Sequence, residues 1–172
     1  MKSIGGDCME YRHVLDPDRK EEICRRILLA LPAWFGDLKA VRQYANSARE
    51  QFFLCALEDE EPVGFLAVQE HTDVACEIVV MGVLPACHRR GIGRRLLEIC
   101  VQFYRARSYR YLTVKTLADT ADSFSYVKTR AFYLACGFEP LEIFETLWDA
   151  ENPCLYMCKP LFESAGAAEQ DF

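Results

Sequence analysis

The chain has 172 residues, of which 51% are hydrophobic and 12% aromatic, a length that supplies one well-buried core and is short for two. Its formal net charge is −6, whereas general nucleic-acid binders and membrane-surface proteins usually carry a basic excess. The composition argues against both kinds of partner. We expect a single domain over residues 1–162 and a loose Gly-, Ala- and Glu-containing tail over residues 163–172.

Nine cysteines are spread over the chain without a Cys-x-x-Cys pair. The odd number argues against a disulfide framework. The three histidines, His13, His71 and His88, lie far apart in the sequence and do not form a typical set of zinc ligands. We therefore expect no metal, thiols that pack as small apolar residues, and a reducing, cytoplasmic setting. The N-terminal stretch MKSIGGDCMEYRH has no apolar run of signal-peptide length, and no other segment approaches the length of a membrane span.

Apolar periodicity, caps and turn residues predict alternating helices and strands. Asp16-Pro17 is a typical helix start, because aspartate caps free N–H groups and proline costs nothing at the first helical position. In chain order we expect a strand at 8–14, helices at 17–31 and 37–49, a hairpin of 52–57 with 63–68, a strand at 77–84, a helix at 90–105, a strand at 111–117, a polar loop at 118–125, a helix through 130–133 that stops at Gly137, and strands at 139–146 and 154–159. This order predicts a mixed α/β sheet.

The stretch CHRRGIGRRLLE, residues 87–98, places four arginines around a glycine pair where a helix is about to begin. A helix N-terminus carries a partial positive charge, so cations crowded there indicate a missing anion. Glycines after a strand let backbone N–H groups approach such a ligand closely. The alternative is a solvated basic turn with a glycine at a tight bend.

Two familiar phosphate motifs do not fit this stretch. A dinucleotide fingerprint needs a third glycine at position 96, where Leu96 stands, and an acidic residue about twenty positions further on. A P-loop needs Gly-Lys-Ser/Thr, which is absent from the stretch.

Two segments together resemble the GNAT superfamily of acyl-CoA-dependent N-acyltransferases. The family's pattern Gln/Arg-x-x-Gly-x-Gly/Ala falls on residues 88–93, with His88 in place of the usual first residue. RAFYLACGF, residues 130–138, resembles the later motif, in which a tyrosine precedes Gly-Phe by four residues. The resemblance implies a twisted, mostly antiparallel sheet that opens where the strands at 77–84 and 109–117 diverge, and an N-acetyltransferase that uses acetyl-CoA.

The resemblance also implies where the cofactor binds. Backbone N–H groups of the glycine loop cradle its pyrophosphate, and arginine side chains offset the charge. Gly82 is expected to mark a strand bulge that admits the pantetheine arm, unless it only makes room for a large neighbour. Tyr126 stands where many members place an asparagine. The expected cofactor-binding residues are Met81, Gly82, Val83, His88, Arg89, Arg90, Gly91, Ile92, Gly93, Arg94 and Tyr126.

Two residues are candidates for proton transfer. Glu77 falls where several family members carry a glutamate base, and a partly desolvated carboxylate can take the proton of an ammonium acceptor, directly or through water. Tyr133 matches the tyrosine that protonates the departing thiolate. The alternative without a catalytic role is that Glu77 is a solvated glutamate at a strand start and that Tyr133 is a core residue. Cys87 has no base beside it except His88, so direct transfer in a ternary complex is preferred over a cysteine intermediate.

The sequence says least about the identity of the acceptor substrate. Trp34, Phe35 and Trp148 are candidates for the wall of an acceptor pocket, since aromatic faces suit a cation or a ring. A small amine, an amino acid, an antibiotic and a protein N-terminus all stay open, as does a homodimer. The rival functions are an acyl-CoA-binding module without catalysis and a nucleotide-binding protein of another fold.

Overall fold

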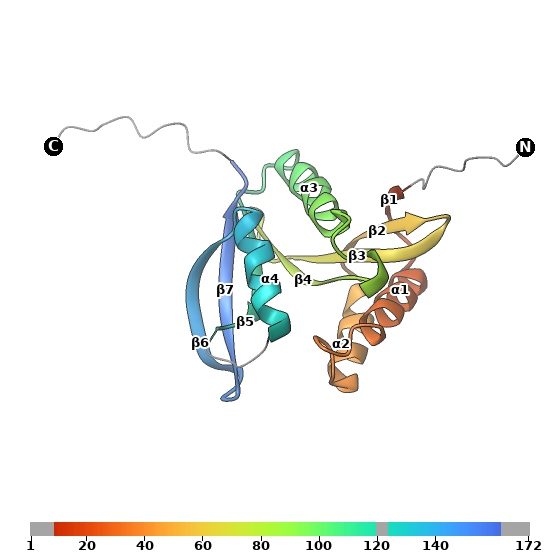
Figure 1. The fold of residues 1–172 in the computed structure, drawn as a ribbon. Helices are drawn as coiled ribbons and strands as arrows, with labels where there is room; N and C mark the ends of the chain where they lie inside the picture. Colours follow the sequence, from red (N-terminus) through yellow and green to blue (C-terminus); the bar gives the residue numbers. More distant parts are fainter. Residues whose placement is uncertain (1–8, 120–123, 163–172) are drawn as a thin grey trace, which may run out of the picture.

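The computed structural model describes residues 9–119 and 124–162, and these residues form one seven-stranded sheet with helices on both faces (Figure 1). The strands are β1 (Met9–His13), β2 (Phe52–Glu58), β3 (Glu61–Glu70), β4 (Ala75–Val83), β5 (Tyr111–Leu117), β6 (Glu139–Asp149) and β7 (Asn152–Pro160). They lie in the order β1-β2-β3-β4-β5-β7-β6. β4 and β5 are parallel, and the other pairs are antiparallel. The predicted mixed, mostly antiparallel sheet is therefore confirmed.

The helices begin close to where the sequence placed them. They are α1 (Pro17–Leu29), α2 (Leu38–Ala48), α3 (Ile92–Arg105) and α4 (Phe124–Ala135), with a short 3₁₀ turn at Pro85–Cys87. The Asp16 side chain accepts bonds from the N–H groups of Asp18 and Arg19, and the Asp37 side chain caps α2 in the same way. α4 includes Ser125, which was expected in a loop, and β6 continues past the expected end at Thr146. The predicted tail and residues 120–123 lie outside the described residues.

Each face of the sheet has its own apolar cluster. α1 and α2 cover one face, and α3 and α4 cover the other. Side chains alternate between the two clusters along each strand: Phe53 and Cys55 belong to the α1/α2 cluster, and Leu54 and Ala56 to the α3/α4 cluster. The sheet thus separates the two clusters.

The sheet opens between β4 and β5. These strands pair only from Ala75 with Tyr111 to Ile78 with Val114. Beyond that point β4 stays with β3, and β5 stays with β7. The expected divergence of the two strands is confirmed, and it leaves the second half of β4 without a partner on its β5 side.

The bulge in β4 lies at Val79 and not at Gly82, so the expected position was wrong. Ala67 pairs with Val80 and Val68 pairs with Ile78, which leaves Val79 as the extra residue. Gly82 pairs in register with Phe65. A Cβ at position 82 would lie 3.1 Å from Ile27 Cγ2 and 3.0 Å from Leu31 Cδ1. The glycine therefore makes room for the large side chains of Ile27 and Leu31, as the alternative interpretation held.

The described cysteines are consistent with a packing role. All eight are free thiols, and six of them are buried. Among the described residues no helix is long and apolar enough to cross a bilayer.

Candidate active site

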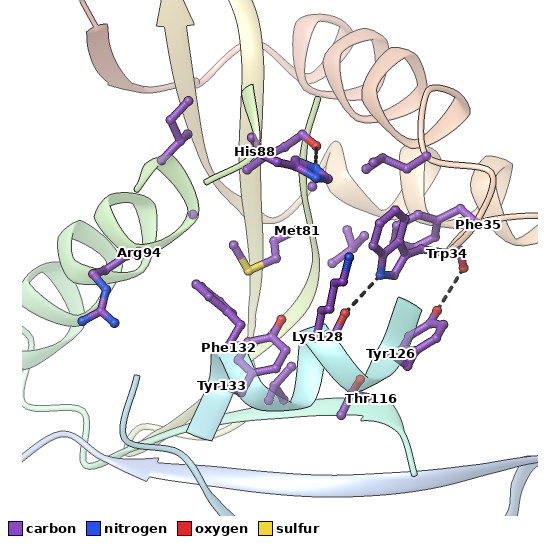
Figure 2. Close-up of a pocket in the computed structure, with 18 of the residues that line it drawn as sticks. Trp34, Phe35, Met81, His88, Arg94, Thr116, Tyr126, Lys128, Phe132 and Tyr133 are labelled. Carbon is purple, nitrogen blue, oxygen red and sulfur yellow. Dashed lines mark hydrogen bonds between the residues drawn. The ribbon is translucent and has the colours of Figure 1, made fainter. Parts of the chain in front are cut away.

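A cavity of about 510 Å³ lies where β4 and β5 separate (Figure 2). Its wall is built from β4, β5, α4, the segment that leads into α3, and the loop between α1 and α2. The predicted site residues that line it are Trp34, Phe35, Met81, Gly82, Val83, His88, Arg89, Gly91, Ile92, Gly93, Arg94, Tyr126, Tyr133 and Trp148. Glu77 and Arg90 do not line it. The fold therefore brings together most of the residues that were selected from distant parts of the chain.

The N-terminus of α3 has free hydrogen-bond donors. Gly91 precedes the helix with a φ of +77°, a left-handed conformation that favours glycine, and no side chain caps the helix. The first bond of the helix runs from Arg95 N–H to the Gly91 carbonyl at 3.0 Å, so the N–H groups of residues 92–94 have no acceptor within the helix. α1 and α2 satisfy the same groups with an aspartate. The uncapped end at the cavity is suited to an anion.

The four arginines of this segment divide into two pairs. Arg90 forms an ion pair with Glu58 on β2, which lowers the pKa of that carboxyl group, and Arg95 pairs with Glu98 at 3.1 Å. Arg89 and Arg94 are among the residues that line the cavity. Arg90 was one of the expected cofactor-binding residues, whereas its guanidinium lies on Glu58 of β2.

Trp34 connects the α1–α2 loop to the opposite wall. Its Nε1 donates to Thr129 Oγ1 at 3.1 Å, and Tyr126 OH donates to the Trp34 carbonyl at 2.9 Å (Figure 2). The Trp34 ring also meets His88 edge to face at 5.9 Å between centroids, and His88 Nε2 lies 2.7 Å from the Val83 carbonyl. Burial raises the pKa of Tyr126 to about 12, so its phenol stays a donor. Tyr126 thus holds the loop against α4.

Tyr133 lies on the α3/α4 side of the opening. It packs against Phe132 and Phe138, is only 4% exposed, and belongs to the α3/α4 cluster. Figure 2 shows its ring projecting from α4 toward Met81. Burial raises the pKa of Tyr133 well above the ordinary tyrosine value. The phenol is consequently neutral at physiological pH and keeps its proton to high pH.

Glu77 lies on the α1/α2 side of the same opening. Its Oε2 accepts a bond from Lys115 Nζ at 2.6 Å and lies 2.9 Å from His71 Nε2. The residue is 9% exposed. After burial itself, the charge of Glu77 is the largest factor that raises the pKa of Tyr44 on α2. Glu77 and Tyr133 therefore flank the opening from opposite faces of the sheet, and Lys115 links Glu77 to the cavity wall.

Several residues of the cavity wall were not among the predicted site residues. Those with a polar or charged side-chain group are Tyr44, Lys115, Thr116, Lys128 and Thr129. Lys115 had a signal, because it is the only charged residue in the strand YLTVKTL. Lys128 has no comparable signal, since one lysine on an exposed helix is common.

A family model described as an acetyltransferase (GNAT) domain matches residues 48–140, more than half of the chain. The matched range runs from the end of α2 to the start of β6 and contains the opening between β4 and β5.

Solved structures share the fold at low sequence identity. A putative GNAT-family acetyltransferase from Desulfovibrio desulfuricans has a TM-score of 0.76 at 19% identity, over 90% of this chain and all of that one. The ribosomal-protein-S18-alanine N-acetyltransferase from Escherichia coli has a TM-score of 0.73 at 16% identity, over 96% of this chain and all of that one. An aminoglycoside 6′-N-acetyltransferase solved with coenzyme A has a TM-score of 0.69 at 15% identity, over 91% of this chain and 98% of that one.

Proposed function

The chain belongs to the GNAT acetyltransferase family, and on that premise we propose that it moves an acetyl group from acetyl-CoA to a primary amine by direct transfer in a ternary complex. Family membership makes it an N-acetyltransferase with an acyl-CoA as co-substrate. The observation that best supports the finer proposal is one continuous cavity. It extends from the uncapped end of α3 on one face of the sheet to Lys115, the partner of Glu77, on the other.

The end of α3 and the second half of β4 would hold acetyl-CoA. The N–H groups of residues 92–94 would bind the pyrophosphate, with Arg89 and Arg94 offsetting its charge. From Val79 to Val83, β4 has no strand partner on its β5 side, and such an edge pairs readily with the amides of a pantetheine arm. An N–H near Met81 to Val83 would stabilise the developing oxyanion.

The two faces of the sheet would divide the proton transfers. Glu77 would take a proton from the acceptor ammonium, directly or through water, on the α1/α2 side. The amine nitrogen would then attack the thioester carbonyl carbon, so that a C–N bond forms and the C–S bond breaks. Tyr133 would protonate the departing thiolate on the α3/α4 side, and the tyrosinate would regain a proton, directly or through water, from the nitrogen that becomes cationic when it attacks. The products are an N-acetylated amine and CoA, with the ammonium proton released to solvent.

Direct transfer is supported by the surroundings of Cys87. The thiol is buried, and its hydrogen-bond partner among the described residues is Arg90 Nη1 at 3.7 Å. His88, the one base next to it in the sequence, has its Nε2 on the Val83 carbonyl. A cysteine nucleophile needs a base to activate it, and neither contact supplies one.

The proposal predicts acetyl-CoA binding, thiol release and a mass gain of one acetyl group on an amine. An acceptor screen read by mass shift, run beside calorimetry with acetyl-CoA, desulfo-CoA and NAD, measures all three. CoA binding without thiol release across a broad amine panel would support the alternative, an acyl-CoA-binding module. Binding of NAD but not CoA would contradict both.

Tyr133→Phe is expected to lower kcat to a similar extent at every pH. The loss should fall near the low end of the usual 10²- to 10⁴-fold contribution of acid catalysis, roughly 10²-fold, because a thiolate is already a good leaving group. The ordinary tyrosine pKa is about 10, and burial raises the pKa of Tyr133 above that value. The parent enzyme therefore keeps its protonated phenol above pH 10, and the variant should remain slower than the parent there. Pre-steady-state thiol release against pH measures it, with Tyr111→Phe, an exposed residue outside the cavity, as the control. A deficit that disappears at high pH, or none at all, would remove Tyr133 from the mechanism.

A further inference from the structure

The charged residues of the cavity wall are all of one sign. Arg89, Arg94, Lys115 and Lys128 line it, and no aspartate or glutamate among the described residues does. The whole chain, in contrast, has a formal net charge of −6. A cavity with low-dielectric walls and one sign of charge favours ligands of the opposite sign and repels those of the same sign.

Two of the four cations are accounted for by the proposed cofactor. Arg89 and Arg94 lie beside the uncapped end of α3, where the pyrophosphate would bind. Lys115 on β5 and Lys128 on α4 lie on other walls of the cavity. Lys115 already pairs with Glu77 at 2.6 Å, whereas no ion pair among the described residues holds Lys128, so this part of the wall has one positive charge that a second anion would match.

We propose that this second anion is a carboxylate on the acceptor itself, and that the acceptor is a free α-amino acid with an apolar or aromatic side chain. This inference rests on the proposed function. Lys115 and Lys128 are assigned the carboxylate, Glu77 receives the proton of the α-ammonium group, and the aromatic wall receives the side chain.

The two charges of the Glu77–Lys115 ion pair are arranged so that they can match the two charges of a zwitterion. Its two opposite charges lie 2.6 Å apart, and an α-amino acid carries an ammonium and a carboxylate separated by a single carbon. Placed antiparallel, the ammonium faces Glu77 and the carboxylate faces Lys115. A simple amine satisfies only Glu77 and leaves Lys115 without its partner, which costs binding energy in a partly buried site.

Lys128 adds a further positive charge to the cavity wall. Figure 2 shows its side chain rising from α4 into the cavity toward Trp34. Its ammonium lies 5.0 Å from the centroid of the Phe124 ring, and no acidic group of the described residues pairs with it. Polycationic acceptors such as aminoglycosides would meet Lys128 and Lys115 as like charges, which disfavours them here.

The rest of the wall limits the size and polarity of the acceptor. Trp34, Phe35, Tyr44 and Trp148 supply aromatic surface, which favours an apolar side chain. The cavity of about 510 Å³ must also admit the thioester arm of the cofactor. The hydrogen bonds between Trp34 and α4 connect two of its walls and so limit the space further. A small free amino acid fits this space better than a folded protein surface.

The test uses acceptor pairs that differ only in the carboxylate. Free L-amino acids and their α-amides are compared by kcat/KM, corrected for the fraction of unprotonated amine, with kanamycin as a polycationic acceptor. We expect the acids to exceed their amides at least about tenfold, the effect of one partly buried charge pair near 1.4 kcal/mol. Amides that equal or exceed the acids, or kanamycin as the best acceptor, would overturn the inference.

The variants locate the effect. Lys128→Gln and Lys115→Gln should each bring the acid-to-amide ratio toward one by raising KM for the acids, while the exposed control Lys39→Gln keeps the ratio of the parent. If Lys128→Gln instead raises KM for acetyl-CoA and leaves the ratio intact, the lysine contacts the cofactor and the assignment is wrong.

A binding experiment separates this inference from the proposed function. Calorimetry of an amino acid and its amide on the protein saturated with desulfo-CoA measures the same preference without turnover. A preference for the acid supports the inference even if no thiol is released, and an equal or weaker affinity for the acid contradicts it even if transfer occurs. Failure of acetyl-CoA binding would contradict the proposed function alone.

Discussion

Glu77→Gln is expected to lower kcat by about 10²- to 10⁴-fold at neutral pH, the usual contribution of a general base, while the affinity for acetyl-CoA stays close to that of the parent. Glutamine keeps the size of the side chain and can still accept a bond from Lys115, which lies 2.6 Å from the carboxylate. It cannot accept the proton of the acceptor. Steady-state rates with one good acceptor and calorimetry with acetyl-CoA measure the two quantities.

The pH dependence distinguishes a chemical defect from a structural one. As pH rises, more of the acceptor amine loses its proton to solvent and no longer needs Glu77, so the rate of the variant should approach that of the parent. A defect caused by the broken ion pair with Lys115 would persist at every pH and would lower the thermal midpoint. Glu142→Gln on the exposed β6 strand is the matched control. Full activity of Glu77→Gln at neutral pH would falsify the base assignment and leave the CoA-binding proposal standing.

Gly91→Asp is expected to weaken acetyl-CoA binding by about 10²- to 10³-fold, because two unit charges 4 Å apart interact by about 4 kcal/mol near a protein surface. A Cβ at position 91 would meet nothing within 4 Å, so the unliganded fold has room for the side chain. The φ of +77° is also one that aspartate tolerates better than most residues. The loss should therefore come from negative charge placed where the phosphates bind. Calorimetry with acetyl-CoA gives the ratio of dissociation constants.

Two further variants test that explanation. Gly91→Asn has nearly the same shape without the charge and tolerates the same backbone conformation, so it should lose only about tenfold, as expected for added bulk alone. His88→Gln keeps a donor for the Val83 carbonyl, to which His88 Nε2 now lies at 2.7 Å, and should bind nearly as well as the parent. Equal losses for Asn and Asp would assign the effect to bulk. An equal loss for His88→Gln would show that side chains, and not the backbone, hold the phosphates.

Local features of the sequence were sufficient for most of the secondary structure. Aspartate caps at Asp16 and Asp37 and the glycine stop at Gly137, whose φ is +82°, were read from a few neighbouring residues each. Period-two and 3.6-residue patterns identified the strands and helices because each pattern depends on burial of one face of one element. The exceptions are the start of α4 and the end of β6, where exposed apolar residues such as Phe124 and Trp148 blurred the pattern.

The candidate site could be predicted from sequence only where its residues are contiguous in the chain. The segment from His88 to Arg94 is one loop and one helix start, so its residues meet because they are adjacent in the chain. The Arg90 side chain is different, since its partner Glu58 is 32 positions away on β2. Nothing local distinguishes it from Arg94, which is one of the residues that line the cavity.

The sequence alone therefore determined the order of elements, the anion-binding helix start and the family resemblance, since each depends on contacts between near neighbours in the chain. The tertiary structure alone decided which residues share the opening. The bulge at Val79 depends on the register of β4 against β3, and the meeting of Glu77 with Lys115 depends on the parallel pairing of β4 with β5. The position of Lys128 opposite Trp34 depends on how α4 packs across the gap. These are long-range pairings, and their geometry is set by the packing of the whole sheet and its helices.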